Sequence, residues 1–396
     1  MKMTKGIGVD IKDVGVAVFN YHFQEILLYI RGETQRSKVI HKSLLGCAMN
    51  KWEPRDFPPR RYWTVSRVAC TDKQNLTLLK EFILMGITGL PELQAPLFGP
   101  LLTVYLVSVV GNLGLIILTK IDSRLQTPMY FFLRHLAFTD LGYSTAVGPK
   151  MLVNYAVDQH TISFNGCATQ LTFFSIFIIN EIFILSAMAY DRYVAIRNPL
   201  LYTAVMSQRL CQVLVVMPYL YSVSLSLLTI MKIFLSSFSD YNVIKHFYCD
   251  SLPLIALLCS GTDEIRLIIL IFSAFNLVSS LLTVLVSYIL ISVAIFRMNS
   301  AEGRHKAFST CGSHLAVIAL FYGTLFFMYV QPKSTHSFDT DNMAALFYTL
   351  VIPMLNPMIY SLRNKEVKNA LRRTWRKCAN IDILQRYCRF GSSPPQ

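Results

Sequence analysis

The sequence predicts an all-α membrane protein, a bundle of seven transmembrane helices, on two observations. First, 53% of the 396 residues are hydrophobic and only 15% are charged, whereas a soluble domain carries about 25% charged residues. Second, the apolar residues gather into seven stretches, each long enough to cross a hydrocarbon core of about 30 Å as a helix. The stretches are Leu97–Thr119, Met129–Val153, Gln170–Tyr193, Leu210–Leu235, Ile265–Phe296, Phe308–Val330 and Met343–Leu362.

Prolines lie inside several of these stretches, and they do not exclude helices. Pro149 lies in the second stretch, Pro218 in the fourth, and Pro353 and Pro357 in the seventh. A proline within a membrane helix frees one backbone carbonyl, and a neighbouring helix can satisfy it. All seven stretches therefore remain predicted helices.

The basic residues predict the orientation of the bundle. They follow the first, third, fifth and seventh stretches, whereas Asp158–Gly166 holds none and Ser236–Asp263 holds only Lys245. By the positive-inside rule, the carboxyl tail is cytoplasmic and the amino terminus is extracellular. The net charge of +14 thus reflects membrane topology and does not indicate nucleic acid. The basic residues on the cytoplasmic side include Lys120, Arg124, Arg192, Arg197, Arg209, Arg297, Arg304, Lys306, Arg363, Lys365, Lys368, Arg372, Arg373, Arg376 and Lys377.

Three of the nine cysteines lie on the expected outer side. Cys167 begins the third stretch, and Cys249 and Cys259 lie in the long outer loop, which is an oxidising compartment. A Cys167–Cys249 disulfide would fix this loop over the helix bundle. The alternative is that all three are free thiols.

The sequence divides into four regions. Residues 1–74 form an atypical amino-terminal extension, and its segment Trp52–Arg61, with three prolines and three arginines, is typical of disorder. Residues 75–96 form an extracellular segment that begins with an N-glycosylation sequon at Asn75. Residues 97–363 form the bundle, and residues 364–396 form a basic cytoplasmic tail.

Several strings of residues follow one another along the chain at a characteristic spacing. Gly111-Asn112 lies in the first stretch, and Ser287-Tyr288 lies in the fifth. Longer strings flank the other stretches: Leu125-Gln-Thr-Pro-Met-Tyr-Phe-Phe-Leu133, Met188-Ala-Tyr-Asp-Arg-Tyr-Val-Ala-Ile196, Lys306-Ala-Phe-Ser-Thr-Cys-Gly-Ser-His-Leu315 and Pro353-Met-Leu-Asn-Pro-Met-Ile-Tyr-Ser-Leu-Arg-Asn364. Through them the chain, from about Asn75 to Lys377, resembles an odorant receptor, a subfamily of the rhodopsin-like G-protein-coupled receptors.

The resemblance implies a seven-helix bundle of the rhodopsin-like receptor type and a function. Such a receptor binds small volatile odorants in the outer half of the bundle and activates a heterotrimeric stimulatory, olfactory-type G protein that raises cyclic AMP. It is not an enzyme and needs no cofactor. Its expected location is the plasma membrane, as a multi-pass protein in the cilia of olfactory sensory neurons. The alternative within this class is a non-olfactory chemosensor on the same scaffold.

Asp191 and Arg192 are the predicted switch, at the cytoplasmic end of the third stretch. An adjacent acid and base can hold each other until a partner protein competes for the arginine. The resemblance implies that movement of the sixth helix frees Arg192, next to Tyr193, for the G protein, and that Tyr288 and Tyr360 stabilise this open state. The structural alternative is an interfacial ion pair that anchors a helix end.

Two acids, Asp140 and Glu181, fall near mid-membrane, where an ionisable residue is costly and usually functional. Asn112, Asn356 and Ser186 can add oxygens to the same region. Two carboxylates with amide oxygens suit a hard cation, and related receptors hold Na⁺ there in the inactive state. The alternative is a protonated, hydrogen-bonded polar cluster.

The resemblance also places the odorant site in the outer halves of the third, fifth, sixth and seventh helices. The side chains expected there are apolar, with a few hydroxyls, one amide and no acid. Such a lining favours small neutral molecules, although an apolar residue in a span more often packs against a helix. The predicted residues are Phe174, Ser175, Ile178, Ile179, Ser273, Asn276, Tyr322, Leu325, Tyr329 and Thr349.

The chain departs from the family pattern in the long outer loop. The family commonly has a cysteine at the position of Ser239, so Cys259 is expected to lack its customary disulfide partner.

Two other classes of membrane protein were considered, a transporter and an enzyme. A transporter would show repeated halves or broken helices in matched positions, and a membrane enzyme would need a nucleophile–base pair or a metal set. The sequence shows none of these patterns.

Overall fold

The computed structural model describes residues 80–88, 91–157, 159–239, 241–297, 300–330, 338–364, 366–374 and 376. The chain divides into two compact units, Met1–Arg67 and Val68–Gln396, and all described residues belong to the second. The predicted extension and the sequon at Asn75 lie outside the described residues.

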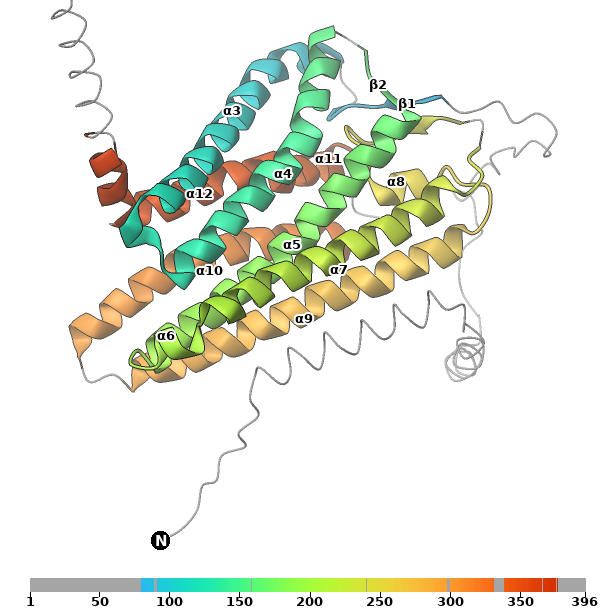
Figure 1. Cartoon of the computed structure of the whole chain (residues 1–396). Helices are drawn as coiled ribbons and strands as arrows, with labels where there is room; N and C mark the ends of the chain where they lie inside the picture. Colours follow the sequence, from blue (N-terminus) through green and yellow to red (C-terminus); the bar gives the residue numbers. More distant parts are fainter. Residues whose placement is uncertain are drawn as a thin grey trace, which may run out of the picture. The chain divides into compact units, whose positions relative to one another are not determined.

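Within the described part of the chain, six long helices and one segmented helix form a bundle (Figure 1). Each predicted stretch lies within one of them, except that the fourth helix ends at Phe234, one residue early. The helices are α3 (Pro91–Ile121), α4 (Pro128–Val157), α5 (Phe164–Arg197), α7 (Gln208–Phe234), α9 (Thr262–Phe296), α10 (Ala301–Val330) and the run α11 (Phe338–Leu346), η3 (Phe347–Val351) and α12 (Ile352–Arg363).

Five helical segments are long and apolar enough to cross a membrane: Pro96–Ile121, Phe164–Arg197, Gln208–Phe234, Thr262–Phe296 and Thr340–Tyr360. The other two long helices, α4 and α10, have 30 residues each, about 45 Å at 1.5 Å per residue. They are more polar because α4 carries charged residues and the apolar part of α10 is short. These features are Arg134, Asp140 and Lys150 in α4 and the apolar segment His314–Phe326 in α10.

Helix α5 is the central element of the bundle, and it contacts α4, α7, α9 and α10. Its 34 residues include both Cys167 and Arg192, which are about 37 Å apart along the axis. The two residues therefore mark opposite ends of the bundle, called here the Cys167 end and the Arg192 end.

Helices α3 and α12 approach closely around a proline. A Cβ atom on Gly111 would lie 2.9 Å from Cγ of Pro357, so this contact requires glycine. Pro357 has no N–H and leaves the carbonyl of Pro353 without its helical donor. Asn112 of α3 supplies the missing donor, because its Nδ2 donates to Pro353 O at 2.9 Å. A neighbouring helix thus satisfies a carbonyl freed by proline, as predicted.

The Cys167 end carries a small sheet that the sequence did not predict. The strands β1 (Glu81–Leu84), β2 (Thr161–Ser163) and β3 (Val243–Ile244) lie in the order β2-β1-β3, with β1 antiparallel to β2 and parallel to β3. Phe82 is fully buried in β1, with its ring centroid 5.9 Å from that of Phe164 and 5.5 Å from that of Phe238. This cluster fixes the segment before α3 over the bundle.

Short elements complete both ends. The Arg192 end has the 3-10 turn η1 (Ser123–Leu125), the short helix α6 (Tyr202–Val205) and a helical segment at residues 366–374. The Cys167 end has α8 (Ser251–Ile255) in the loop between α7 and α9.

Candidate functional site

Asp191 and Arg192 lie side by side in α5 but have different partners. Asp191 is buried, and its Oδ1 accepts a hydrogen bond from the hydroxyl of Tyr202 in α6 at 2.8 Å. Arg192 is half-buried and donates to Sδ of Met129 in α4. Within the described residues no hydrogen bond or ion-pair contact joins the two, so the structure shows no direct contact between the expected acid and base. The reason is geometric, since adjacent residues on a helix do not face each other.

The two tyrosines predicted to stabilise the open state lie at the same end. The hydroxyl of Tyr288 in α9 forms a hydrogen bond with Nδ1 of His314 in α10 at 2.7 Å. The hydroxyl of Tyr360 in α12 is buried and has no partner among the described residues. Tyr193 packs with Tyr288 against a small apolar cluster that includes Ile291. In this conformation Tyr288 links α9 to α10.

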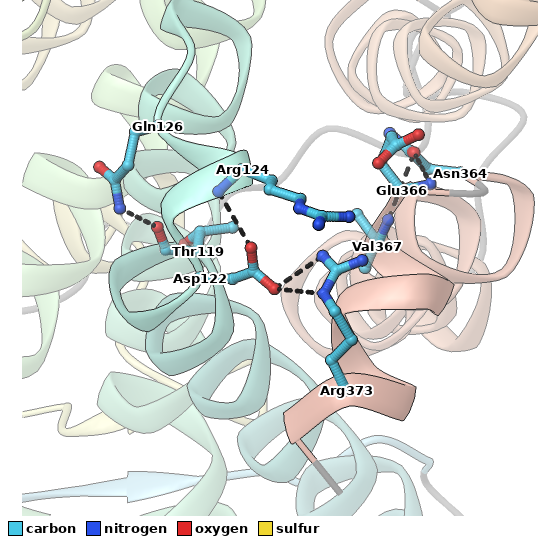
Figure 2. Close-up of polar contacts among 8 residues, drawn as sticks. All are labelled: Thr119, Asp122, Arg124, Gln126, Asn364, Glu366, Val367 and Arg373. Atoms are coloured by element: carbon cyan, nitrogen blue, oxygen red, sulfur yellow. Dashed lines mark hydrogen bonds and ion pairs between the residues drawn. The ribbon is translucent and has the colours of Figure 1, made fainter. Parts of the chain in front are cut away.

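A second set of contacts at the Arg192 end joins the turn after α3 to the segment after α12 (Figure 2). The Nη2 and Nε atoms of Arg373 donate to Oδ2 of Asp122 at 2.7 Å and 3.1 Å. Asp122 also accepts a bond from the backbone N–H of Arg124 at 3.0 Å. The Arg373 guanidinium holds the pKa of the Asp122 carboxyl below its usual value.

The next residues extend this link toward α4. The Nδ2 of Asn364 donates to the hydroxyl of Tyr130 in α4 at 3.0 Å, and Oδ1 of Asn364 accepts from the backbone N–H of Glu366 at 2.9 Å. Asn364 therefore connects α4 to the start of the helical segment 366–374. The end of α12 is held by hydrogen bonds to two other parts of the chain.

The predicted polar cluster forms in the middle of the bundle. Asp140 of α4 is fully buried, and its carboxylate accepts from Nδ2 of Asn356 in α12 at 2.9 Å and from the hydroxyl of Tyr143 at 3.2 Å. Glu181 of α5 is also fully buried, beside Tyr143 and Asn356. The amide nitrogen of Asn112 instead donates to the backbone carbonyl of Pro353 in α12 and not to the two acids.

Several oxygens of this cluster have no hydrogen-bond partner among the described residues. They are Oε1 and Oε2 of Glu181 and Oδ1 of Asn112. An unpartnered buried oxygen costs about 1–3 kcal/mol, so these oxygens have unused hydrogen-bonding capacity. Within the described residues no group of three or more His, Cys, Asp or Glu side chains could hold a metal ion.

The predicted odorant-site residues fall into three sets by exposure. Phe174, Asn276, Tyr322, Leu325 and Thr349 are buried, and Ser175, Ile178 and Ile179 are half-buried. Ser273 is exposed on α9, and the side chain of Tyr329 lies outside the described residues. The set therefore has a buried centre from which Ser273 is excluded.

The polar groups of this buried centre are already ordered. Oδ1 of Asn276 accepts from the hydroxyl of Tyr221 in α7 at 2.7 Å. The hydroxyl of Tyr322 donates to Oγ of Ser280 at 2.8 Å, and Oγ1 of Thr349 donates to the carbonyl of Ala345 at 2.8 Å. Neighbouring helices thus fix the orientation of Asn276 and Tyr322.

The loop between α7 and α9 covers the Cys167 end of this region. The predicted Cys167–Cys249 disulfide is present, and the backbone N–H of Cys249 donates to Oε1 of Gln170 at 2.9 Å. The ring of Tyr248 is buried, and its centroid lies 5.2 Å from that of the Phe174 ring. The Tyr248 hydroxyl forms a hydrogen bond with the hydroxyl of Tyr348 in η3. The loop thereby reaches α5 and the π-helical turn η3.

The structure adds the environment of two further loop residues, His246 and Cys259. His246 is buried between Phe247 and Tyr248, neither ring nitrogen has a partner among the described residues, and burial lowers its pKa to about 3. Cys259 is disulfide-bonded, although Ser239 stands where the family commonly has its partner cysteine.

The bundle defines the class of protein. Its fold matches squid rhodopsin with a TM-score of 0.57 at 19% identity, over 72% of this chain and 80% of that chain. At this identity the likeness shows the fold alone, which is that of the rhodopsin-type seven-helix receptors.

The sequence comparisons give the family within that class. The olfactory receptor family profile matches residues 101–377. Human "Olfactory receptor 8K3" is 70% identical over 312 residues, which cover 79% of this chain and 100% of the relative. Human "Olfactory receptor 8K5" is 65% identical, over 75% of this chain and 97% of the relative, and mouse "Olfactory receptor 8U3" is 57% identical, over 75% and 93%. The chain belongs to the olfactory receptor family.

Membership of this family confirms several predictions. The protein is an odorant receptor and not an enzyme, and it is a multi-pass protein of the plasma membrane. Receptors of this class act with a ligand and a G protein, and they generally need no cofactor. The particular ligand site and G protein remain to be proposed.

Sequence reasoning missed the partners that fix the predicted residues. Tyr202, Met129 and His314 hold Asp191, Arg192 and Tyr288, respectively. One signal was available for the loop: Tyr248 precedes Cys249, so the predicted disulfide would have brought its ring to α5. The Asp122–Arg373 pair had no signal, because the two residues are 251 positions apart in the sequence.

Proposed function

We propose that this receptor binds small, neutral, volatile molecules among α5, α9, α10 and η3. Asn276 carries the proposal. It is 3% exposed, its Oδ1 is engaged by Tyr221, and its Nδ2 donates to none of the described residues. Because Tyr221 occupies the amide oxygen, the amide nitrogen is the group of Asn276 that remains to donate to a ligand with an acceptor oxygen. No acid or base is among the predicted lining residues, which supports a neutral ligand.

The shape of the ligand follows from the apolar residues around this donor. Phe174, Leu325 and the half-buried Ile178 and Ile179 offer dispersion contacts but no further charge. A pocket with one or two polar groups in an apolar lining fixes the orientation of a small molecule by those groups. We therefore expect esters, ketones, aldehydes and ethers of moderate length as agonists.

The test replaces the amide by an apolar group of similar size. Asn276→Leu should weaken agonists with an acceptor oxygen by about 2- to 10-fold in half-maximal concentration, the value of one hydrogen bond. The matched control is Ser273→Ala, one turn away on the same helix but exposed, which should leave potency unchanged. Ligand-evoked cyclic AMP over an odorant panel is the measurement. An unaltered panel for Asn276→Leu would remove this site.

For the signalling step we propose a stimulatory, olfactory-type G protein that binds at the Arg192 end and raises cyclic AMP. Among the described residues, the hydrogen bond of the Arg192 side chain is to a neutral sulfur of Met129, which a partner protein with an acceptor oxygen can replace. Movement of α10 would break the Tyr288–His314 bond, and Tyr288 and the unpartnered Tyr360 could then bond to each other or to Arg192. This order of events leaves Asp191 on Tyr202 and keeps the loop after α5 in place.

This step requires the Arg192 end to be cytoplasmic and the amino terminus to be extracellular, which the distribution of basic residues supports. The expected site of action is the ciliary membrane of olfactory sensory neurons. An epitope tag after residue 376 should be reached by antibody only in permeabilised cells. Staining of intact cells would overturn the orientation.

A sodium ion is the proposed modulator of the polar cluster. Glu181 offers two unpartnered buried oxygens near the carboxylate of Asp140, Asn112 offers one more on α3, and oxygen ligands of this type suit a hard cation. These three residues would hold the ion, which would favour the inactive arrangement. Replacing sodium by a large organic cation should raise basal cyclic AMP, and the same change in Glu181→Gln should have little effect. A basal signal that ignores sodium would eliminate the ion.

A further inference from the structure

A groove with a volume of ≈ 1050 Å³ lies between α4 and α5 and reaches β2. It contains none of the predicted odorant-site residues. Phe138 of α4 and Phe173 of α5 line it, and their side chains are 48% and 50% exposed on the outside of the bundle. On a membrane protein such rings face the hydrocarbon, so the groove opens toward lipid.

The deep part of the groove is aromatic. The centroid of the Phe177 ring lies 5.7 Å from that of Phe138, with the two rings edge to face, and 6.4 Å from that of Phe173, with the two rings stacked. The floor depends on Gly142, because a Cβ atom there would lie 2.6 Å from ring atoms of Phe177. This part offers contact to an alkyl chain and no hydrogen bond.

The other part of the groove is polar and carries one cation, Lys150 of α4. Most polar side chains around it are already bonded within the protein: Oγ of Ser163 accepts from Gly166, Oγ1 of Thr169 donates to Asn165, and Nε2 of Gln170 donates to Ala146. No described residue pairs with the ammonium group of Lys150. An occupant with an anionic group, such as a phosphate, would complement this ammonium group.

The length of the groove identifies this occupant. Lys150 follows Phe138 by 12 residues, or about 18 Å along α4, and half of a hydrocarbon core is about 15 Å. The groove thus runs from the interface to the midplane on the Cys167 side. We propose that it binds a phospholipid of this leaflet, with one acyl chain along Phe138 and Phe177 and the phosphate on Lys150. A small volatile ligand is too short to use both parts.

The lipid would act on the helices that hold the polar cluster. Asp140 lies two residues after Phe138 in α4, and Glu181 lies one turn after Phe177 in α5. An acyl chain against these rings fills the outer side of the interface whose inner side holds the two acids. The bound lipid therefore stabilises the spacing of α4 and α5 around the cluster.

The test uses the full chain in nanodiscs that contain phosphatidylcholine with a photoreactive group in one acyl chain. Peptide mapping should find labels on residues of α4 and α5 around Phe138 and Phe177. Lys150→Gln should lower this labelling about 5-fold, which corresponds to ~1 kcal/mol for a partly exposed ion pair. Thr145→Trp, from the exposed side of the groove, should abolish it by filling the space.

Two variants serve as matched controls. Arg266→Gln removes a cation of α9 near the same end of the bundle, and Val153→Trp adds a ring to an exposed position of α4 outside the groove. Both should label like the unmodified chain. Equal labelling in all variants, or displacement of the probe by a fatty acid but not by unlabelled phosphatidylcholine, would overturn the proposal. The labelling does not depend on an odorant, so a failed odorant response leaves this result intact.

Discussion

The two ends of the bundle are held together in different ways. At the Cys167 end, a disulfide, a three-stranded sheet and buried aromatic rings connect the loop between α7 and α9 to α5 and η3. At the Arg192 end, the described contacts are apolar packing, hydrogen bonds and an ion pair, and they include Asp191 with Tyr202, Tyr288 with His314, and Asp122 with Arg373. Both ends have a packed core, but a disulfide and a sheet also resist opening at the Cys167 end, whereas polar contacts at the Arg192 end can exchange for new partners. The difference fits the proposal that the G protein binds at the Arg192 end.

The largest expected effect comes from the disulfide. Cys249→Ser should lower the free energy of unfolding by about 2–4 kcal/mol and release the Tyr248 ring from η3. Loss of surface expression and a lower thermal midpoint of the purified receptor are the measurements. Cys211→Ser, at a buried free cysteine of α7, is the control and should retain expression. If Cys249→Ser and Cys211→Ser lose the same expression and thermal stability, the disulfide does not account for the greater rigidity expected at the Cys167 end.

At the opposite end, Arg192→Ala should abolish ligand-evoked cyclic AMP and leave surface expression intact, because the hydrogen bond that it removes among the described residues is the one to Met129. Arg209→Ala, which removes an exposed basic residue at the same end, should signal normally. Unchanged signalling in Arg192→Ala would separate this residue from the switch.

The buried His246 should make the Cys167 end acid-sensitive. Burial lowers its pKa to about 3, against about 6.5 for an exposed histidine, so the unfolded chain binds the proton first. Stability is therefore complete above about pH 6.5 and falls as the pH drops toward 3. Between pH 7.5 and 5.5 the loss should be ~1 kcal/mol.

His246→Phe keeps an aromatic ring at this position and should remove that acid sensitivity. Thermal midpoints of both proteins at the two pH values give the comparison. If His246→Phe and the unmodified receptor lose the same stability on acidification, the acid sensitivity comes from another group.

The smallest effect is expected from the Asp122–Arg373 pair, which is partly exposed and so contributes about 0.2–1 kcal/mol. Asp122→Arg and Arg373→Asp should each lower the thermal midpoint slightly, and the double exchange should restore most of it. Because Arg373 lowers the pKa of Asp122, the stabilisation is present above about pH 4 and is lost only below it. A double exchange that is no better than the single ones would show that the two charges do not interact.

Much of the candidate site followed from the sequence because its residues lie on long helices. Asp140 and Glu181 fall at the same depth of two adjacent spans, so their meeting in the core could be predicted from counting along the helices. The same count placed Arg192 at the opposite end from Cys167. Ser273 is exposed, which the sequence could not show, because its depth is set by the sequence but the direction of its side chain is set by the rotation of α9.

The sequence by itself determined the seven long helical segments, the approximate depth of their polar residues and the Cys167–Cys249 bond, because hydrophobic length and family motifs are local properties. Only the tertiary structure decided which side chains meet. In the folded protein, Asp191 accepts a hydrogen bond from Tyr202, Asn112 donates to Pro353, and a groove forms beside Lys150. These pairings depend on the rotation and spacing of whole helices, and every helix contributes to both, so no local stretch of residues encodes them.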